Sequence, residues 1–141
     1  MSIAENKTSE LWRESRSRAK AIAGRIGDES FSARVYSADY SFSRFDPHAV
    51  FDKWACVRVG ESNPELFEIL EIPSGKYAVF HHCGPAASAP ATFGYIFGTW
   101  VLNSGFDLDD RPHFEILPAR YDPFDPVAEE EIWVPVRTKL T

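Results

Sequence analysis

A pattern of residues occurs twice in this chain at a constant spacing, and this repeat constrains the fold more than any other feature of the sequence. The tripeptide Phe-Asp-Pro at 45–47 recurs at 124–126, and a tryptophan follows each copy, Trp54 or Trp133. A Val-Arg pair follows each tryptophan at the same distance, so the offset is 79 residues throughout. Self-similarity of this kind predicts two copies of one unit, helix–strand–strand, facing each other about a pseudo-two-fold axis. The alternative is a chance match between two short hairpins.

Hydrophobic periodicity predicts the elements of each copy. We expect helices over 5–26 and 91–103, the first of which ends at Gly24 and Gly27. We expect strands over 31–42, 51–59, 70–82, 112–121 and 129–138. This order predicts an α+β fold with an antiparallel sheet. With 141 residues the chain has the length of one domain, with one module at about 1–64 and the other at about 65–141.

Composition and charge exclude several classes of protein. A formal net charge of −6 repels a phosphate backbone, so we expect no direct nucleic-acid ligand. No apolar run of membrane-spanning length occurs, and the N-terminus lacks the apolar core of a signal peptide. The two cysteines are too few for a disulfide framework, which favours a cytoplasmic protein with reduced thiols. No nucleotide or cofactor fingerprint is present, and we expect no cofactor.

The offset of 79 pairs Tyr36 with Glu115, each in the first strand of its hairpin. Period-two alternation places Glu115 and Leu117 on one face of their strand. We infer that Glu115 and Trp133 share a face, and that Tyr36 and Trp54 share the equivalent face. If the two units meet, a carboxylate, a tyrosine and two indoles converge near the axis.

A carboxylate surrounded by aromatic rings suits an organic cation, and 14% of this chain is aromatic. A ring face attracts a cation by about 0.5–2 kcal/mol, more when the pair is dry. Alternatively, since desolvation of a carboxyl group favours its protonated form, Glu115 is a candidate general acid or base. A third possibility is that Glu115 pairs with an arginine such as Arg34 or Arg120, and that both tryptophans only pack in the core.

Two further clusters carry less chemistry. His81, His82 and Cys83 are consecutive, so a strand points them to alternate faces, and we expect structural histidines and no metal. The run 129–131 consists of three glutamates, and we expect it to lie on the surface at the start of a strand.

Five stretches resemble one known family, the GyrI-like small-molecule-binding domain, also called the AraC effector-binding domain. They are NKTSELW (6–12), FDKWACV (51–57), IPSGKYAVFHHCGP (72–85), YIFGTWVLNSGFDLDDRPHFEIL (95–117) and EEEIWVPV (129–136). The resemblance implies two pseudo-symmetric βαββ modules around a central ligand cleft. Here the first strand of module one is missing or very short, which leaves a sheet edge where a second copy of the chain, a covering loop or solvent lies.

The resemblance also implies roles for individual residues. It implies that Glu115 contacts the cation and that Trp133 forms a wall of the cavity. It also implies that Tyr36 is the site tyrosine of the first hairpin. Residues implied or inferred to complete the site are Trp54, Leu117, the helix aromatics Tyr95, Phe97 and Trp100, and Trp12 at the opening.

From these features we expect a free-standing protein that binds hydrophobic, cationic small molecules for sensing or sequestration. Two alternatives remain. The resemblance extends to hydrolases of cyclopropanoid compounds, in which Glu115 would activate water, and to protein-interaction modules that contact a regulator or DNA gyrase. We expect no DNA-binding segment in this chain.

Overall fold

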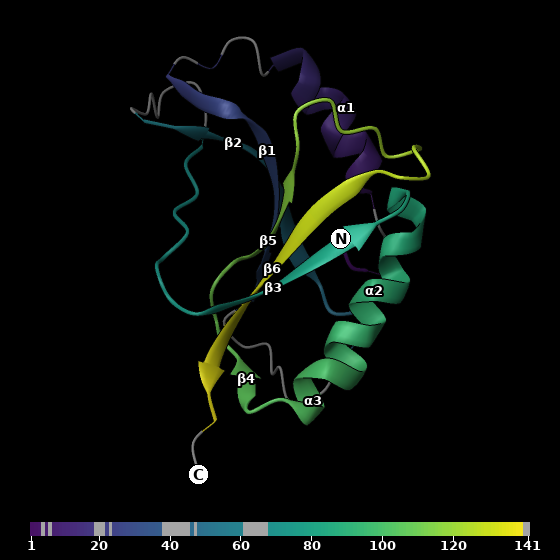
Figure 1. Cartoon of the computed structure of the whole chain (residues 1–141). Coiled ribbons are helices and arrows are strands. Elements are labelled where there is room, and N and C mark those ends of the chain that lie inside the picture. The colour runs from purple at the N-terminus through teal and green to yellow at the C-terminus, as the bar shows by residue number, and fades with distance from the viewer. Residues whose placement is uncertain are drawn as a thin grey trace.

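The chain forms an antiparallel β-sheet with helices packed on one of its faces (Figure 1). The computed structural model describes residues 1–3, 5, 7–18, 22, 24–37, 46, 48–60 and 68–139. The helices are α1 (Thr8–Arg18), α2 (Ala89–Tyr95) and α3 (Val101–Asn103). The strands are β1 (Arg25–Tyr36), β2 (Phe51–Val59), β3 (Tyr77–Cys83), β4 (Phe106–Leu108), β5 (His113–Leu117) and β6 (Glu129–Thr138).

The strands follow the order β2-β1-β5-β6-β3, and β4 pairs with β6 outside this path. Every pair is antiparallel. The central strands are therefore β1, β5 and β6, whereas β2 and β3 lie at the edges. This arrangement confirms the predicted α+β class and the antiparallel sheet.

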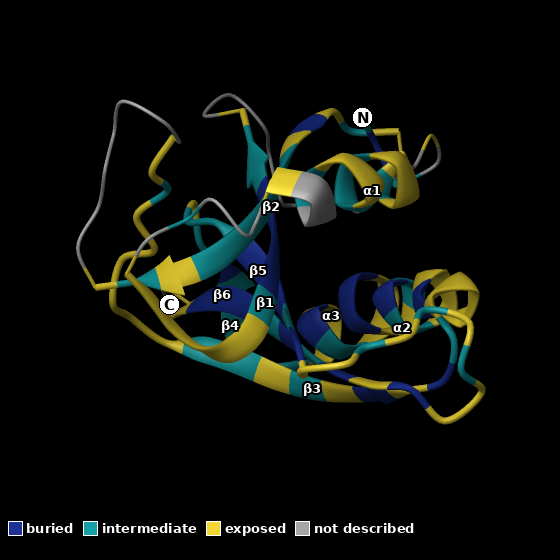
Figure 2. Ribbon diagram, turned by 90° about the horizontal axis from the view of Figure 1, so that it is seen from above, coloured by how far each residue is buried: buried dark blue, intermediate teal, exposed yellow. Residues whose placement is uncertain are grey.

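Helix α1 and the helical segment from α2 to α3 lie on the same side of the sheet, which we call the helix-side face (Figure 2). A π-helical turn at Ile96–Trp100 joins α2 to α3 and makes one continuous helix. Its residues Ile96 and Phe97 belong to the same buried core as Ile132 and Val134 of β6. Complete burial of such a side chain contributes about 1.5–3 kcal/mol, so this core fixes α2 on the sheet. No described helix is long and apolar enough to cross a membrane.

The opposite face of the sheet carries a second apolar group, which we call the aromatic cluster. It consists of Phe31, Trp54, Tyr77, Phe114 and Trp133. The ring of Phe114 lies at its centre, 6.2 Å from Phe31, 5.6 Å from Tyr77 and 5.4 Å from Trp133 between centroids. The sheet therefore separates two apolar layers, one beneath the helices and one on the opposite side.

The edge strand β2 is hydrogen-bonded at its first residue to the N-terminal residue of the chain. The amino group of Met1 donates to the Phe51 carbonyl (3.3 Å), and the Phe51 N–H donates to the Met1 carbonyl (2.9 Å). Among the described residues no strand precedes α1. Pairing of this edge with a second copy of the chain stays a prediction.

Two predicted element boundaries at the start of the chain were wrong or untested. The first helix was expected to reach residue 26, but Arg25 and Ile26 already belong to β1. Gly24 and Gly27 have φ angles of 76° and 73°, in the left-handed region that glycine tolerates and a right-handed helix excludes. Residues 38–42, the end of the next predicted strand, lie outside the described residues.

The later boundaries agree better with the sequence. The predicted strands at 51–59 and 129–138 match β2 and β6 in full. The strand expected from residue 70 begins only at Tyr77, whose hydroxyl donates to the Pro73 carbonyl at 2.8 Å. The short strand β4 was not predicted.

The two copies of the sequence repeat differ in cross-strand register. Trp54 lies opposite Ala33, whereas Trp133 lies opposite Phe114. An offset of 79 carries Trp54 onto Trp133 but carries Ala33 onto Pro112, two residues before Phe114. A two-residue difference keeps the same face of each strand but changes which side chains meet. The pseudo-symmetric modules stay a prediction.

Candidate functional site

Four ionisable side chains from four strands lie buried on the helix-side face, and we call them the charge cluster. They are Arg34 of β1, Lys53 of β2, Glu115 of β5 and Glu130 of β6. As whole residues Arg34, Glu115 and Glu130 are 2%, 8% and 6% exposed, and the Lys53 side chain is 6% exposed. Burying a charge costs several kcal/mol even after the protein relaxes, so four such groups together mark a specialised region.

Strand register brings these residues to one face. Arg34 lies opposite Lys53 in the β1–β2 pair. Glu115 lies opposite Ile132, a core residue beneath α2, and Glu130 shares the face of Ile132 because it is two residues away. The apolar neighbours on this face thus hold the charged residues under the helices.

Glu115 is the acidic centre of the charge cluster. Its Oε1 lies 3.5 Å from Arg34 Nη2, and its Oε2 lies 3.9 Å from Lys53 Nζ. One carboxylate therefore faces two cations at distances longer than a charge-assisted hydrogen bond of about 2.8 Å. The sequence-based alternative in which Glu115 pairs with Arg34 agrees with this geometry.

The guanidinium of Arg34 occupies an aromatic environment. Its Cζ lies 4.3 Å from the ring centre of Phe93 on α2 and 5.7 Å from that of Phe51 on β2. These distances are within the range of a cation–π interaction, about 6 Å. Glu115 and the two rings thus surround a cation of the same chain, Arg34, and neither Phe93 nor Phe51 is among the aromatic residues that the sequence analysis named.

Several donors in this region lack acceptors. Within the described part of the chain, Ser32 Oγ and the Nε and Nη2 atoms of Arg34 are buried and make no hydrogen bond. A buried polar group without a partner costs about 1–3 kcal/mol, more when it is charged. Ser32 lies opposite Glu115 in the β1–β5 pair and two residues from Arg34, so these donors share one face.

Burial and neighbouring charges shift the pKa values of the cluster. Burial lowers the pKa of Lys53, an effect that Arg34 reinforces and Glu115 opposes. Burial and then the charge of Glu115 raise the pKa of Glu130 to about 7. The Tyr121 hydroxyl donates to Glu130 Oε2 at 3.4 Å, which partly offsets that rise. Glu130 therefore exchanges a proton near neutral pH.

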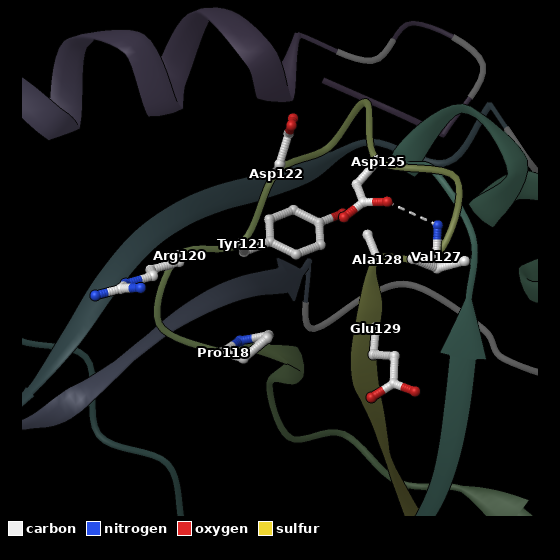
Figure 3. A pocket seen from close by; sticks show the side chains of 8 residues that line it. All are labelled: Pro118, Arg120, Tyr121, Asp122, Asp125, Val127, Ala128 and Glu129. Carbon is white, nitrogen blue, oxygen red and sulfur yellow. Dashed lines mark hydrogen bonds between the residues drawn. The ribbon is translucent and has the colours of Figure 1, made fainter.

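Tyr121 also borders an open hollow of about 210 Å³ between β5 and β6 (Figure 3). The hollow is formed by the turn at 118–129. Asp122 and Asp125 in its wall accept hydrogen bonds from the backbone N–H groups of Phe124 and Val127, both at 2.9 Å. These two aspartates stabilise the turn, whereas Tyr121 connects the hollow with Glu130.

Three of the predicted site residues, Tyr36, Glu115 and Leu117, lie on the helix-side face of the sheet, and Phe97 packs against this face from the helix. The ring centres of Tyr36 and Phe97 lie 5.2 Å and 5.9 Å from that of His113, which is buried beside Arg34 in the β1–β5 register. The predicted shared face of Glu115 and Leu117 is confirmed by strand alternation.

The expectation that both tryptophans share this face was wrong. Residues directly opposite in a sheet point to the same side, and Trp133 lies opposite Phe114 rather than Glu115. Trp133 stacks on Phe114 at 5.4 Å with 17° between the planes. Trp54 lies opposite Ala33 and joins the same aromatic cluster. Alternation alone does not reveal which face of a strand is inward, and the sequence analysis assigned that face incorrectly.

The remaining predicted aromatic residues occupy three different environments. Trp100 packs edge-on against Phe80 at 5.0 Å within the core between helix and sheet. Tyr95 is 53% exposed. Trp12 is half-buried on α1.

Sequence reasoning missed Lys53, Glu130 and Tyr121. Glu130 was expected on the surface, but it is buried. The available signal was alternation, because Glu130 has the same parity as Ile132 and Val134. Lys53 shares the parity of the buried Phe51 in the same way.

His82, one of the two consecutive histidines, has a structural role. His82 is buried, and its ring nitrogens lie 2.8 Å from Thr92 Oγ1 and 3.1 Å from Ser88 Oγ, at the start of α2. His81 is exposed on the other face. Within the described residues, no three metal-ligating side chains come together.

Comparison with known proteins agrees with the resemblance seen in the sequence. The transcriptional regulator BrlR of Pseudomonas aeruginosa is 26% identical to this chain over 130 residues. The match covers 90% of this chain and 45% of BrlR, so the chain spans less than half of that relative's length. The family model of the GyrI-like small molecule binding domain matches residues 3–137. Because the match extends over nearly the whole chain, this protein belongs to the GyrI-like small molecule binding domain family.

Proposed function

We propose that this chain binds a small organic molecule against the helix-side face of its sheet, next to the charge cluster, for sensing or sequestration. Membership of a small-molecule-binding family supports binding in general. The observation that supports this location is a set of four buried ionisable side chains that includes Arg34, whose Nε makes no hydrogen bond to the described residues. Perturbed and desolvated ionisable groups are concentrated at functional sites.

Apolar and polar side chains both surround Arg34, as they do the ligand in small-molecule sites. Phe93 of α2 and Phe51 of β2 flank the guanidinium of Arg34. Tyr36 packs edge-on against Phe51 at 5.3 Å and extends the apolar wall along β1. Glu115 then supplies an acceptor, and Arg34 supplies donors.

The sequence favours a hydrophobic cation as ligand, and this stays a prediction. An organic cation that contacts Glu115 must displace Arg34 from the carboxylate and from the rings of Phe93 and Phe51. Ring faces contribute about 0.5–2 kcal/mol to either cation, so a ligand gains little over the resident guanidinium from the rings alone.

One observation favours hydrolysis as a second candidate function. Glu130 has a pKa raised to about 7 and lies on the same face as Glu115, so one carboxyl group can donate or accept a proton at neutral pH. Turnover of a cyclopropane-bearing electrophile that is lost in Glu130→Gln and Glu115→Gln would select this function. Absence of turnover across a panel of such electrophiles would remove it.

The binding proposal is tested by titrating the protein with hydrophobic fluorescent dyes and following fluorescence anisotropy. Tyr36→Leu removes an aromatic wall from the helix-side face, and Trp54→Leu is its matched control on the opposite face of the neighbouring strand. We expect Tyr36→Leu to weaken binding by about tenfold, which corresponds to 1.4 kcal/mol, and Trp54→Leu by less than about twofold. Failure of every dye to bind, or the reverse order of the two variants, would refute the proposal.

A further inference from the structure

We propose that the ligand of this site carries an anionic group, a carboxylate or a similar acid, which Arg34 receives together with Ser32 and Lys53. This inference rests on the proposed function and specifies the charge of the small molecule. It differs from the cationic ligand that the sequence favours, and it follows from the contacts of the charge cluster.

The balance of charge on the helix-side face is the first argument. Two cations, Arg34 and Lys53, face the single carboxylate of Glu115 at 3.5 Å and 3.9 Å. Glu130 adds only part of a negative charge near pH 7 because burial raises its pKa to about 7. Two basic side chains thus share one carboxylate, and burial lowers the pKa of Lys53. An incoming anion would stabilise the charged forms of Arg34 and Lys53, whereas an incoming cation would compete with them for Glu115.

The unmet hydrogen-bonding capacity is the second argument. A guanidinium carries five N–H donors, which form bidentate pairs with carboxylates most favourably. Arg34 Nε and Ser32 Oγ are buried and make no hydrogen bond to the described residues. Arg34 Nη2 makes no hydrogen bond either, although it lies 3.5 Å from Glu115 Oε1 in an ion pair. A ligand carboxylate offers two acceptors, and its binding would satisfy donors that are otherwise a cost of about 1–3 kcal/mol each.

The position of these donors is the third argument. Ser32 and Arg34 are two residues apart on the central strand β1, so their side chains leave the same face about 7 Å apart. Lys53 lies directly opposite Arg34 on β2. The rings of Phe93 and Phe51 hold the guanidinium plane from α2 and β2. The donors are thus fixed by rigid elements and lie beside two aromatic rings.

The test compares three probes that share one apolar body and differ in charge. They are anthracene-9-carboxylate, 9-anthracenemethanol and 9-(aminomethyl)anthracene, titrated at pH 7.5 and low ionic strength. We expect the carboxylate to bind at least about tenfold more tightly than the ammonium probe. If the ammonium probe binds most tightly, the anionic assignment is wrong while small-molecule binding stands. If none of the three binds, both proposals fail.

Two variants locate the carboxylate. Arg34→Met keeps the length of the side chain. We expect this variant to bind the carboxylate probe at least about tenfold more weakly, while its affinity for the alcohol probe changes by less than about twofold. Because this change leaves Glu115 with only Lys53, a folding defect is a concern, and Ser32→Ala provides an independent test. Removal of a buried hydroxyl without a partner leaves the midpoint of thermal unfolding unchanged or higher, whereas affinity for the carboxylate falls by about threefold or more. Unchanged carboxylate affinity in a folded Arg34→Met or in Ser32→Ala would overturn the inference.

Discussion

The two faces of the central strands differ completely in chemistry, although neighbouring residues form them. Phe114 and Glu115 are consecutive in β5, yet Phe114 stacks on Trp133 in the aromatic cluster and Glu115 faces Arg34 under the helices. In β6, Glu130 belongs to the charge cluster and Glu131 to the opposite face, where its carboxylate accepts a hydrogen bond from the Trp133 indole at 3.3 Å. Cross-strand register, rather than residue type, thus decides which groups meet.

The two faces also contribute differently to stability. The aromatic cluster buries large apolar areas, which stabilise the fold in proportion to the surface removed from water. The charge cluster carries desolvated ions and unpartnered donors, which reduce stability. Proteins retain such unfavourable arrangements mainly at functional sites, which is why the helix-side face supports the binding proposal.

The largest expected effect concerns Glu115. Glu115→Gln leaves Arg34 and Lys53 buried without their counter-charge, so we expect the free energy of unfolding to fall by about 3 kcal/mol. Urea unfolding at pH 7 measures it. Glu131→Gln is the matched control on the opposite face, and there we expect a loss of less than about 1 kcal/mol. Equal losses in the two variants would remove the distinction between the faces.

A smaller effect concerns Glu130 and appears as a pH dependence. Folding raises its pKa from an ordinary 4.5 to about 7, so the folded state holds this proton more tightly than the unfolded chain. Stability therefore falls as pH rises through this window, and the penalty is complete above the folded pKa. We expect Glu130→Gln to flatten the pH profile by about 2 kcal/mol between pH 5 and pH 8 relative to the unaltered protein.

The matched control for this change is Glu129→Gln, because Glu129 is the exposed neighbour of Glu130. Urea unfolding at a series of pH values measures both. A profile that is equally steep with and without the Glu130 carboxyl would assign the pH dependence to another group.

Alternation along a strand predicts which residues of that strand share a face, but it does not predict which residues of neighbouring strands meet. The pairing of Glu115 with Leu117 on one face needs only a period of two, and it was predicted correctly. The relation between Glu115 and Trp133 needs the register between β5 and β6, which depends on long-range pairing that one strand's sequence does not contain. The inward position of Glu130 needs no register, because Glu130 has the same parity as the buried Ile132, but a run of three glutamates was expected on the surface.

The family resemblance could not supply these missing contacts either. It assigns a ligand role to Glu115 but says nothing of Arg34 and Lys53, which come from β1 and β2. Their proximity to Glu115 depends on the order β2-β1-β5 across the sheet. Strand order joins residues more than sixty positions apart in sequence, and only the folded structure reveals it.

The smallest expected effect concerns Trp133, which the family resemblance assigns to a cavity wall. Trp133→Phe keeps a ring on Phe114 but removes the indole that bonds Glu131, so we expect unfolding free energy to fall by about 1 kcal/mol. Because the ring lies on the face away from Glu115, dye affinity should change by less than about twofold in the same anisotropy titration. A loss of affinity as large as that of Tyr36→Leu would mean that the ligand lies on the aromatic cluster, and it would restore the role that the resemblance implies.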